Sequence, residues 1–255
     1  MKAVFKTDRG RVRPHNEDNG GVFLANNDDS ILVLVADGMG GHRAGDVASE
    51  MAVQAMKELW EKNPPSSQPD ESEKWLIESI KNVNHQLFLH ASENEECKGM
   101  GTTMVAAICS DSFSTVANIG DSRCYINNDL GFSQFTEDHT LVYELVRSGQ
   151  ISREDAEHHP RKNVILRALG TEEDVQIDIK TITFEEGDCL LLCSDGLSNK
   201  VSDDDMKTII ESEETLEEQV ERLVDLANEN GGEDNITIII VKNDATAEDE
   251  SGDQT

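Results

Sequence analysis

Four aspartates stand at the ends of apolar runs in this sequence, each beside small or turn-forming residues. They occur in ILVLVADGMGG, VANIGDSR, LLLCSDGLSN and GGEDNITIII, and they are Asp37, Asp121, Asp195 and Asp234. A further acidic group, NEDN at 16–19, precedes an early β-like stretch. A carboxylate at the end of a buried strand is costly unless it is solvated, paired or bound to a cation. Oxygen ligands without cysteine or histidine suit Mg²⁺ or Mn²⁺.

Each of these aspartates, taken alone, is also compatible with an ordinary turn. Asp-Gly and Gly-Asp pairs are common after strands. The number of such positions favours a site, as do the glycines Gly38, Gly40 and Gly41, which allow close approach of the backbone. The spacing leaves open whether the side chains converge.

Other hydrolase chemistries need motifs that this sequence lacks. No cysteine is followed by arginine in a Cys-x₅-Arg pattern, and neither a G-x-x-x-x-G-K-[ST] nor a G-x-S-x-G motif occurs. Asp203 and Asp205 form an Asp-x-Asp pair, but Met206 follows, and the pair lies at the start of a predicted helix. Of these hydrolase chemistries, metal-assisted hydrolysis is the one that the sequence leaves open.

The composition excludes several classes of partner. The 255 residues include 22 Lys and Arg against 52 Asp and Glu, a formal net charge of −30. Nucleic-acid binding needs clustered positive charge, so we expect no nucleic-acid partner. No apolar run reaches the roughly 18–20 residues of a membrane-spanning helix, and the first residues lack the apolar stretch of a signal peptide. We expect a soluble cytoplasmic protein with no membrane association.

The cysteines point to no disulfide framework and no zinc site. They form no C-x-x-C pair and lie mostly within apolar runs, at Cys97, Cys109, Cys124, Cys189 and Cys193. We expect five reduced, buried thiols.

Short β-type runs and helical patterns would position the acidic residues. The runs expected as strands are 31–36, 102–109, 113–118, 123–126, 180–184, 189–193 and 236–241. Apolar residues three and four apart predict helices within 44–62 and 73–90, and two more begin after Ser202 and at a Thr215–Glu218 capping box. Strands and helices come in pairs, without strict βαβ alternation. The pattern favours an antiparallel sheet sandwich with helix pairs outside, an α+β fold.

Eight segments in chain order resemble the protein phosphatase 2C family, in its compact bacterial type. They are GRVRPHNEDN (10–19), VADGMGGHRAGDVAS (35–49), GMGTTMVAAI (99–108), VANIGDSRCYI (116–126), TEDHTLV (136–142), ILRALG (165–170), CSDGLSN (193–199) and GGEDNITIIIV (231–241). The resemblance runs from about residue 1 to 241. It implies a metal-dependent serine/threonine protein phosphatase with a four-layer α-β-β-α sandwich.

The resemblance also implies roles for individual acidic residues. Asp37 corresponds to the aspartate that bridges two metal ions, and Gly38 supplies a backbone carbonyl to one of them. Asp195 and Asp234 correspond to ligands of the first ion.

Three further carboxylates complete the implied metal site. Glu17 corresponds to the carboxylate near the second ion, and Asp18 would bind metal through water or orient the nucleophile. Asp121, with Asp195, corresponds to the ligands of a third ion. The implied cofactors are thus two Mn²⁺ or Mg²⁺ ions, with a third at Asp121.

Arg13 corresponds to the family's phosphate-binding arginine, four residues before Glu17. The family mechanism is direct attack by a metal-bridging hydroxide, with Arg13 gripping phosphoryl oxygens through its planar fork. Many eukaryotic members carry histidine where this chain has Met39, so the general acid is unassigned. His42 and His139 are given no role.

The resemblance also predicts the domain organisation. Residues 1–243 would form one catalytic domain, with a flap at about 145–163. The polar, acidic composition of 244–255 separately predicts a disordered tail. The flap segment carries Arg147, Arg153, Arg161 and Lys162. These cations either engage phosphorylated protein loops or belong to a solvated, mobile helix pair.

The sequence therefore predicts hydrolysis of phosphoserine and phosphothreonine in proteins, in opposition to a bacterial serine/threonine kinase. The expected partners are phosphorylated proteins, a cognate kinase and its substrates, and we expect a monomer. A regulator-type phosphatase with one dedicated substrate is disfavoured because no sensor domain is attached. The alternative is a pseudophosphatase that only binds phosphoproteins, which the presence of Asp37, Asp195 and Asp234 disfavours.

Overall fold

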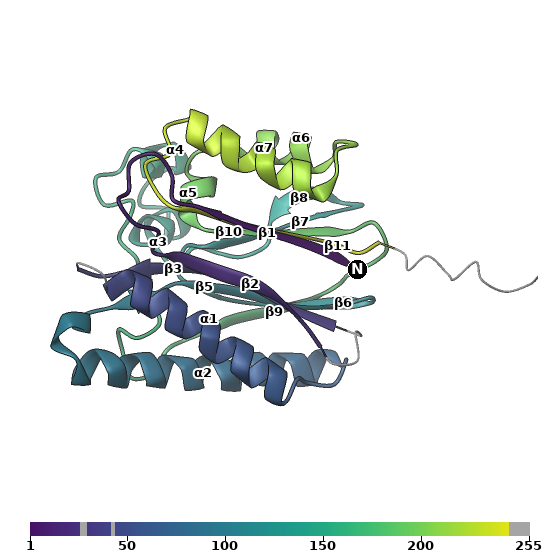
Figure 1. Ribbon diagram of the computed structural model, residues 1–255. Helices are drawn as coiled ribbons and strands as arrows, with labels where there is room; N and C mark the ends of the chain where they lie inside the picture. Colours follow the sequence, from purple (N-terminus) through teal and green to yellow (C-terminus); the bar gives the residue numbers. More distant parts are fainter. Residues whose placement is uncertain (26–29, 42–43, 245–255) are drawn as a thin grey trace, which may run out of the picture.

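The computed structural model describes residues 1–25, 30–41 and 44–244. Two antiparallel sheets pack face to face, with a helix pair on each outer face (Figure 1). The predicted α+β sandwich of four layers is confirmed. Of the described helices, none is long and apolar enough to cross a membrane. His42 and the predicted tail beyond Asp244 lie outside the described residues.

The first sheet has the strand order β1-β11-β10-β7-β8. Its strands are β1 (Lys2–Asp8), β7 (Arg123–Asn128), β8 (Gly131–Gln134), β10 (Cys189–Cys193) and β11 (Ile236–Lys242). Helices α6 (Asp203–Ile210) and α7 (Leu216–Glu229) cover its outer face (Figure 1). Ser202 caps α6, and Thr215 with Glu218 forms the predicted capping box of α7.

The second sheet has the strand order β2-β3-β5-β6-β9, with the short β4 paired to β3. Its strands are β2 (Asp18–Leu24), β3 (Ser30–Met39), β4 (Gly101–Thr102), β5 (Met104–Ser110), β6 (Phe113–Ile119) and β9 (Asp178–Thr183). Helices α1 (Ala44–Lys62) and α2 (Pro69–Glu93) cover this sheet, and a 3₁₀ turn, η1 (Glu95–Cys97), follows.

Strand β3 shows how a continuous apolar run packs on both of its faces. Leu32 and Leu34 pack against the α1–α2 side, whereas Val33 and Val35 pack between the sheets. Side chains alternate across a strand, so a continuous apolar run buries both faces. The five cysteines are free and buried, as predicted.

The predicted strand 102–109 is wrong in its continuity, because the chain breaks into β4 and β5 at Thr103. The Thr103 N–H donates a 2.9 Å hydrogen bond to the Asp37 carbonyl, and its hydroxyl accepts a 3.0 Å bond from the Asp37 N–H. Both bonds hold the end of β3.

A segment with two short helices lies between β8 and β9. They are α3 (Leu141–Arg147) and α4 (Arg153–Glu157). An isolated antiparallel bridge joins Thr140 to Ile165 and closes this segment at its base. The predicted flap, 145–163, falls inside it.

Candidate active site

Asp18 and Asp37 face each other across two paired strands. The β2–β3 register places them directly opposite. The Ser194 hydroxyl donates a 2.6 Å hydrogen bond to Oδ2 of Asp18. Antiparallel pairing therefore brings the NEDN segment beside the aspartate at the end of β3.

Asp195 and Asp234 lie at the ends of neighbouring strands of the other sheet. Asp195 begins the short helix α5 (Asp195–Ser198) after β10, and Asp234 comes just before β11. A Cβ at Gly196 would lie 1.9 Å from the Asn235 carbonyl oxygen and 3.4 Å from Cβ of Asp234. Only glycine fits there, and its small size lets the two aspartates lie side by side.

Glu17 and the Gly38 carbonyl meet over the first turn of α1. The Gly38 N–H donates a 3.1 Å hydrogen bond to the Glu17 carbonyl. A Cβ at Gly45 would lie 2.9 Å from the Gly38 carbonyl oxygen and 3.0 Å from Cδ of Glu17. Two predicted ligand groups thus share a narrow space that a glycine keeps open.

Asp121 lies in the turn between β6 and β7 and is buried. Because β7 pairs with β10, with Arg123 opposite Cys193, this turn lies near Asp195. Asp121 and Asp195 also line one cleft of about 850 Å³, together with the flap residues Arg153 and Lys162.

The carboxylates at these strand ends act on one another electrostatically. Burial, followed by the charges of neighbouring aspartates, raises the pKa of Asp121 to about 7 and that of Asp195 to about 6. Burial likewise raises the pKa of Asp18 to about 7 and that of Asp37 well above its ordinary value. Asp234 contributes negative charge to Asp18, Asp37 and Asp195. Carboxylates from distant parts of the chain therefore gather at one end of the sandwich.

The donor set fits hard divalent cations. Oδ1 of Asp121 and Oδ1 of Asp195 are buried without a hydrogen-bond partner, which is costly unless a ligand compensates them. Among the residues that the structure describes, no group of three or more His, Cys, Asp or Glu side chains is arranged closely enough to hold a metal ion. Arg13 donates a hydrogen bond to Asp234, and Ser194 donates one to Asp18. The assignments as metal ligands remain predictions.

Arg13 lies at the mouth of this acidic group. Its Nη2 donates a 2.7 Å hydrogen bond to Oδ2 of Asp234, and both side chains are partly exposed. Burial lowers the pKa of Arg13, but the charges of Asp234, Glu17 and Asp37 raise it above its ordinary value. The arginine therefore lies where it could reach an anion bound at the carboxylates.

Asn235 is a site residue that sequence reasoning missed. Its Oδ1 accepts a 2.8 Å hydrogen bond from the Glu17 N–H, and its Nδ2 donates bonds of 2.9 Å to the carbonyls of Arg9 and His15. The side chain ties the loop that carries Arg13 and Glu17 to the start of β11. The only signal in the sequence was its place directly after Asp234.

Comparisons with known proteins identify the family. The family model described as protein phosphatase 2C matches residues 11–237. The chain is 51% identical over 246 residues to the serine/threonine phosphatase stp of Listeria monocytogenes, covering 96% of this chain and 97% of that protein. It is 37% identical over 241 residues to the protein phosphatase PhpP of Streptococcus pneumoniae, covering 94% and 97%.

A solved structure shows the same fold. The serine/threonine phosphatase Stp1 from Staphylococcus aureus matches with a TM-score of 0.89 at 39% identity, covering 94% of each chain. The family match spans most of the sequence, and the structural match covers 94% of the chain. The chain therefore belongs to the protein phosphatase 2C family.

Proposed function

We propose that this protein hydrolyses phosphoserine and phosphothreonine in proteins with Mn²⁺ or Mg²⁺ and so opposes a bacterial serine/threonine kinase. The gathering of Asp18, Asp37, Asp121, Asp195 and Asp234 at one end of the sandwich carries this proposal. The relatives named serine/threonine phosphatases support the substrate class. The proposed partners are phosphoproteins and the kinase that modifies them, met in the cytoplasm by a monomer.

The proposed metal ligands are the oxygen donors already described. They are the carboxylates of Glu17, Asp18, Asp37, Asp195 and Asp234 and the Gly38 carbonyl for two ions, and Asp121 with Asp195 for a third. When bound, such ions supply Lewis acidity that makes water a nucleophile near neutral pH and neutralises charge on phosphoryl oxygens.

The protein's own side chains would orient the phosphate and the attacking water. Arg13 presents a planar fork that can hold two phosphoryl oxygens, provided that Asp234 gives up its hydrogen bond. Asp18 is fixed by hydrogen bonds from Ser194 and Thr237, so its carboxylate is positioned to orient water for in-line attack. No phosphorylated enzyme intermediate is required.

Phosphate release measured with and without metal tests the proposal. Hydrolysis of p-nitrophenyl phosphate and of phosphoserine and phosphothreonine peptides should require Mn²⁺ or Mg²⁺ and should stop with a chelator. Metal-independent turnover, or turnover of phosphotyrosine peptides alone, would contradict it. Phosphopeptide binding without phosphate release would support the pseudophosphatase instead. Anomalous scattering at the Mn edge from soaked crystals would locate the ions directly.

A further inference from the structure

His139 is a buried histidine that links the Asp121 turn to the base of the flap. Its main-chain N–H donates a 2.9 Å hydrogen bond to the Gly120 carbonyl, and its ring Nδ1 accepts a 3.2 Å bond from the Gly120 N–H. Only 6% of the histidine is exposed. Gly120 directly precedes Asp121. The His139 main chain therefore holds the carbonyl of the Gly120–Asp121 peptide, and the ring holds the N–H of the peptide before it.

These contacts define the tautomer of the ring. The Gly120 nitrogen can only donate, so Nδ1 must be unprotonated and the proton must lie on Nε2. Nε2 is 3.2 Å from Oδ2 of Asp178, the first residue of β9, and 3.3 Å from Nη1 of Arg167. Because the guanidinium can only donate, Asp178 is the group that accepts the Nε2 proton. Burial lowers the pKa of His139, which favours this neutral ring. One imidazole thus joins the β6–β7 turn to β9.

The same residue holds both ends of the flap. Thr140, the next residue, caps α3, and its bridge to Ile165 closes the flap segment. The His139 carbonyl accepts a 2.7 Å hydrogen bond from the Leu166 N–H. Two residues past the bridge, Arg167 donates a 3.0 Å bond from Nη1 to Oδ1 of Asp178.

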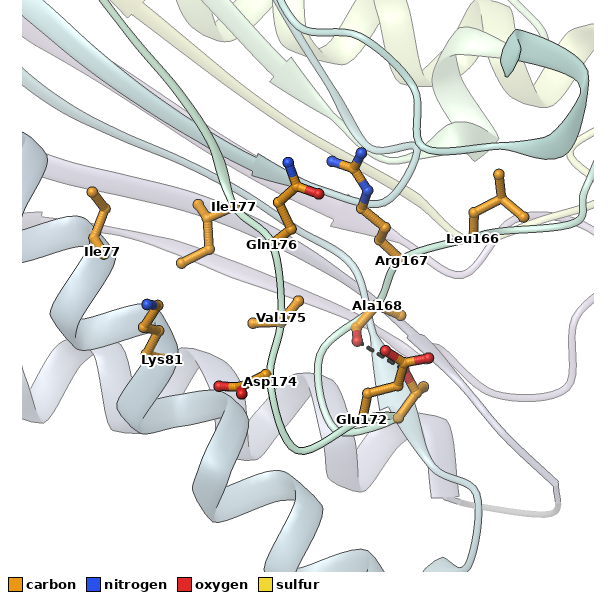
Figure 2. Close-up of a pocket in the computed structure, with 11 residues that line it drawn as sticks. Ile77, Lys81, Leu166, Arg167, Ala168, Glu172, Asp174, Val175, Gln176 and Ile177 are labelled. Carbon is orange, nitrogen blue, oxygen red and sulfur yellow. Dashed lines mark hydrogen bonds between the residues drawn. The ribbon is translucent and has the colours of Figure 1, made fainter. Parts of the chain in front are cut away.

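The segment that follows the flap places the Arg167 side chain beside His139 and Asp178. Residues 166–168, 171–172 and 174–177 line a cleft of about 710 Å³ beside α2. Figure 2 shows the Arg167 guanidinium directed away from the acidic side chains of Glu172 and Asp174 in the same cleft. Asp178 therefore accepts hydrogen bonds from both the His139 ring and the Arg167 side chain.

We propose that His139 is a positioning residue that couples the flap to the Asp121 carboxylate. Displacement of either end of the flap must move the His139 main chain or ring, and with them the two peptides that flank Gly120, the second of which carries Asp121. Substrate contacts made by the flap are thereby transmitted to a predicted metal ligand. The effect on turnover rests on the proposed function, whereas the mechanical coupling does not.

Two isosteric variants separate the two links of the ring. In His139→Asn the side-chain carbonyl lies where Nδ1 stands and can still accept from Gly120, but it cannot reach Asp178. In His139→Gln the amide reaches toward Asp178 but cannot accept from Gly120. Hydrogen–deuterium exchange in metal-free protein should show Gly120 exchanging about 10-fold faster in His139→Gln, the rate change expected from one lost hydrogen bond. His139→Asn should keep Gly120 protected and instead speed exchange at 164–168.

Metal titration extends the test to the proposed site. His139→Gln should raise the Mn²⁺ concentration that gives half-maximal turnover about 10-fold relative to wild type. In His139→Asn that concentration should stay close to the wild-type value. His85→Asn, an exposed histidine on α2, is the matched control and should change nothing.

The outcomes distinguish failure of the coupling from failure of the proposed function. Equal Gly120 exchange in wild type and His139→Gln would overturn the coupling, as would uniform loosening of the whole protein in both variants. Separate exchange patterns without any turnover in wild type would support the coupling and refute the phosphatase proposal.

Discussion

The Arg13 guanidinium donates a 2.7 Å hydrogen bond to Asp234, 221 positions further along the chain. A proposed phosphate ligand and a proposed metal ligand are therefore hydrogen-bonded to each other. Both side chains are partly exposed, so the pair contributes little to the free energy of unfolding. Its importance lies in keeping the arginine beside the carboxylates.

Arg13→Lys should lower kcat/KM for phosphopeptides about 10-fold, because an ammonium group cannot hold two phosphoryl oxygens in a planar fork. The melting temperature should hardly change. Arg11→Lys, the same substitution two residues earlier in the same loop, is the control and should retain activity. Equal effects of the two variants on kcat/KM would remove the assigned role of Arg13.

Asp37→Asn should abolish Mn²⁺-dependent turnover, with a loss of at least about 1,000-fold, while making the metal-free protein more stable. The reason is that Asp37 is crowded by Asp18, Asp195, Asp121 and Asp234, which raise its pKa after burial has done so. Removing one negative charge relieves this repulsion and should raise the melting temperature in chelator by about 3 °C.

Asp129→Asn provides the control for Asp37→Asn, since Asp129 lies exposed in the β7–β8 turn. It should alter neither turnover nor melting temperature. Phosphatase activity of Asp37→Asn within a few-fold of wild type would contradict the assignment of Asp37 as the ligand that bridges two metal ions.

Asp121 should make the stability of the metal-free protein depend on pH. Its pKa is raised from 3.8 to about 7 in the folded state, so folding favours the protonated form. The stabilisation is complete below about pH 4 and is lost as the pH rises to about 7, by at most about 1.4 kcal/mol per pH unit. Urea unfolding of wild type and Asp121→Asn in chelator isolates this contribution as the difference between the two.

Above pH 7 the difference in the free energy of unfolding between wild type and Asp121→Asn should no longer change with pH. Added Mn²⁺ should stabilise the wild type more than the variant. A difference that does not vary between pH 4 and 7 would mean that Asp121 ionises as an exposed carboxylate does. It would also argue against a crowded acidic site.

Gly45→Ala should weaken Mn²⁺ binding without weakening the helix. Its Cβ would press on the Gly38 carbonyl oxygen at 2.9 Å and on Cδ of Glu17 at 3.0 Å, both predicted ligand groups. Alanine itself favours a helix over glycine by about 0.5–1 kcal/mol. Titration calorimetry should show Mn²⁺ affinity about 10-fold lower. Gly41→Ala, where a Cβ would meet nothing within 4 Å, should bind Mn²⁺ normally; equal affinities for the two variants would contradict the proposed packing.

The flap cations should act selectively on protein substrates. Arg153 and Lys162 line the cleft that contains Asp121, whereas Arg147 donates a 2.8 Å hydrogen bond to Glu144 within α3. Neutralising Arg153 and Lys162 together should raise KM for an acidic phosphopeptide several-fold and weaken its salt dependence, with p-nitrophenyl phosphate unaffected. Arg147→Ala is the control. An unchanged KM in the double variant would assign these cations to a solvated surface.

Local patterns in the sequence were sufficient for the fold class and for much of its detail. Apolar spacing and end signals located α1 within 44–62, and the Thr215–Glu218 capping box marked the start of α7. Strands β1 and β8 were not predicted. Both are edge strands of the first sheet, so each depends on one neighbour in the fold more than on its own residue pattern.

The sequence by itself determined which residues could bind a divalent cation and that each stands where a strand meets a turn. Residue type and turn position are local properties, so Asp37, Asp195 and Asp234 could be identified without coordinates. Only the tertiary structure decided that they lie together, because that depends on strand register and on the packing of two sheets. These long-range pairings also produced the contacts of Asn235 and His139, whose partners lie far away in the chain.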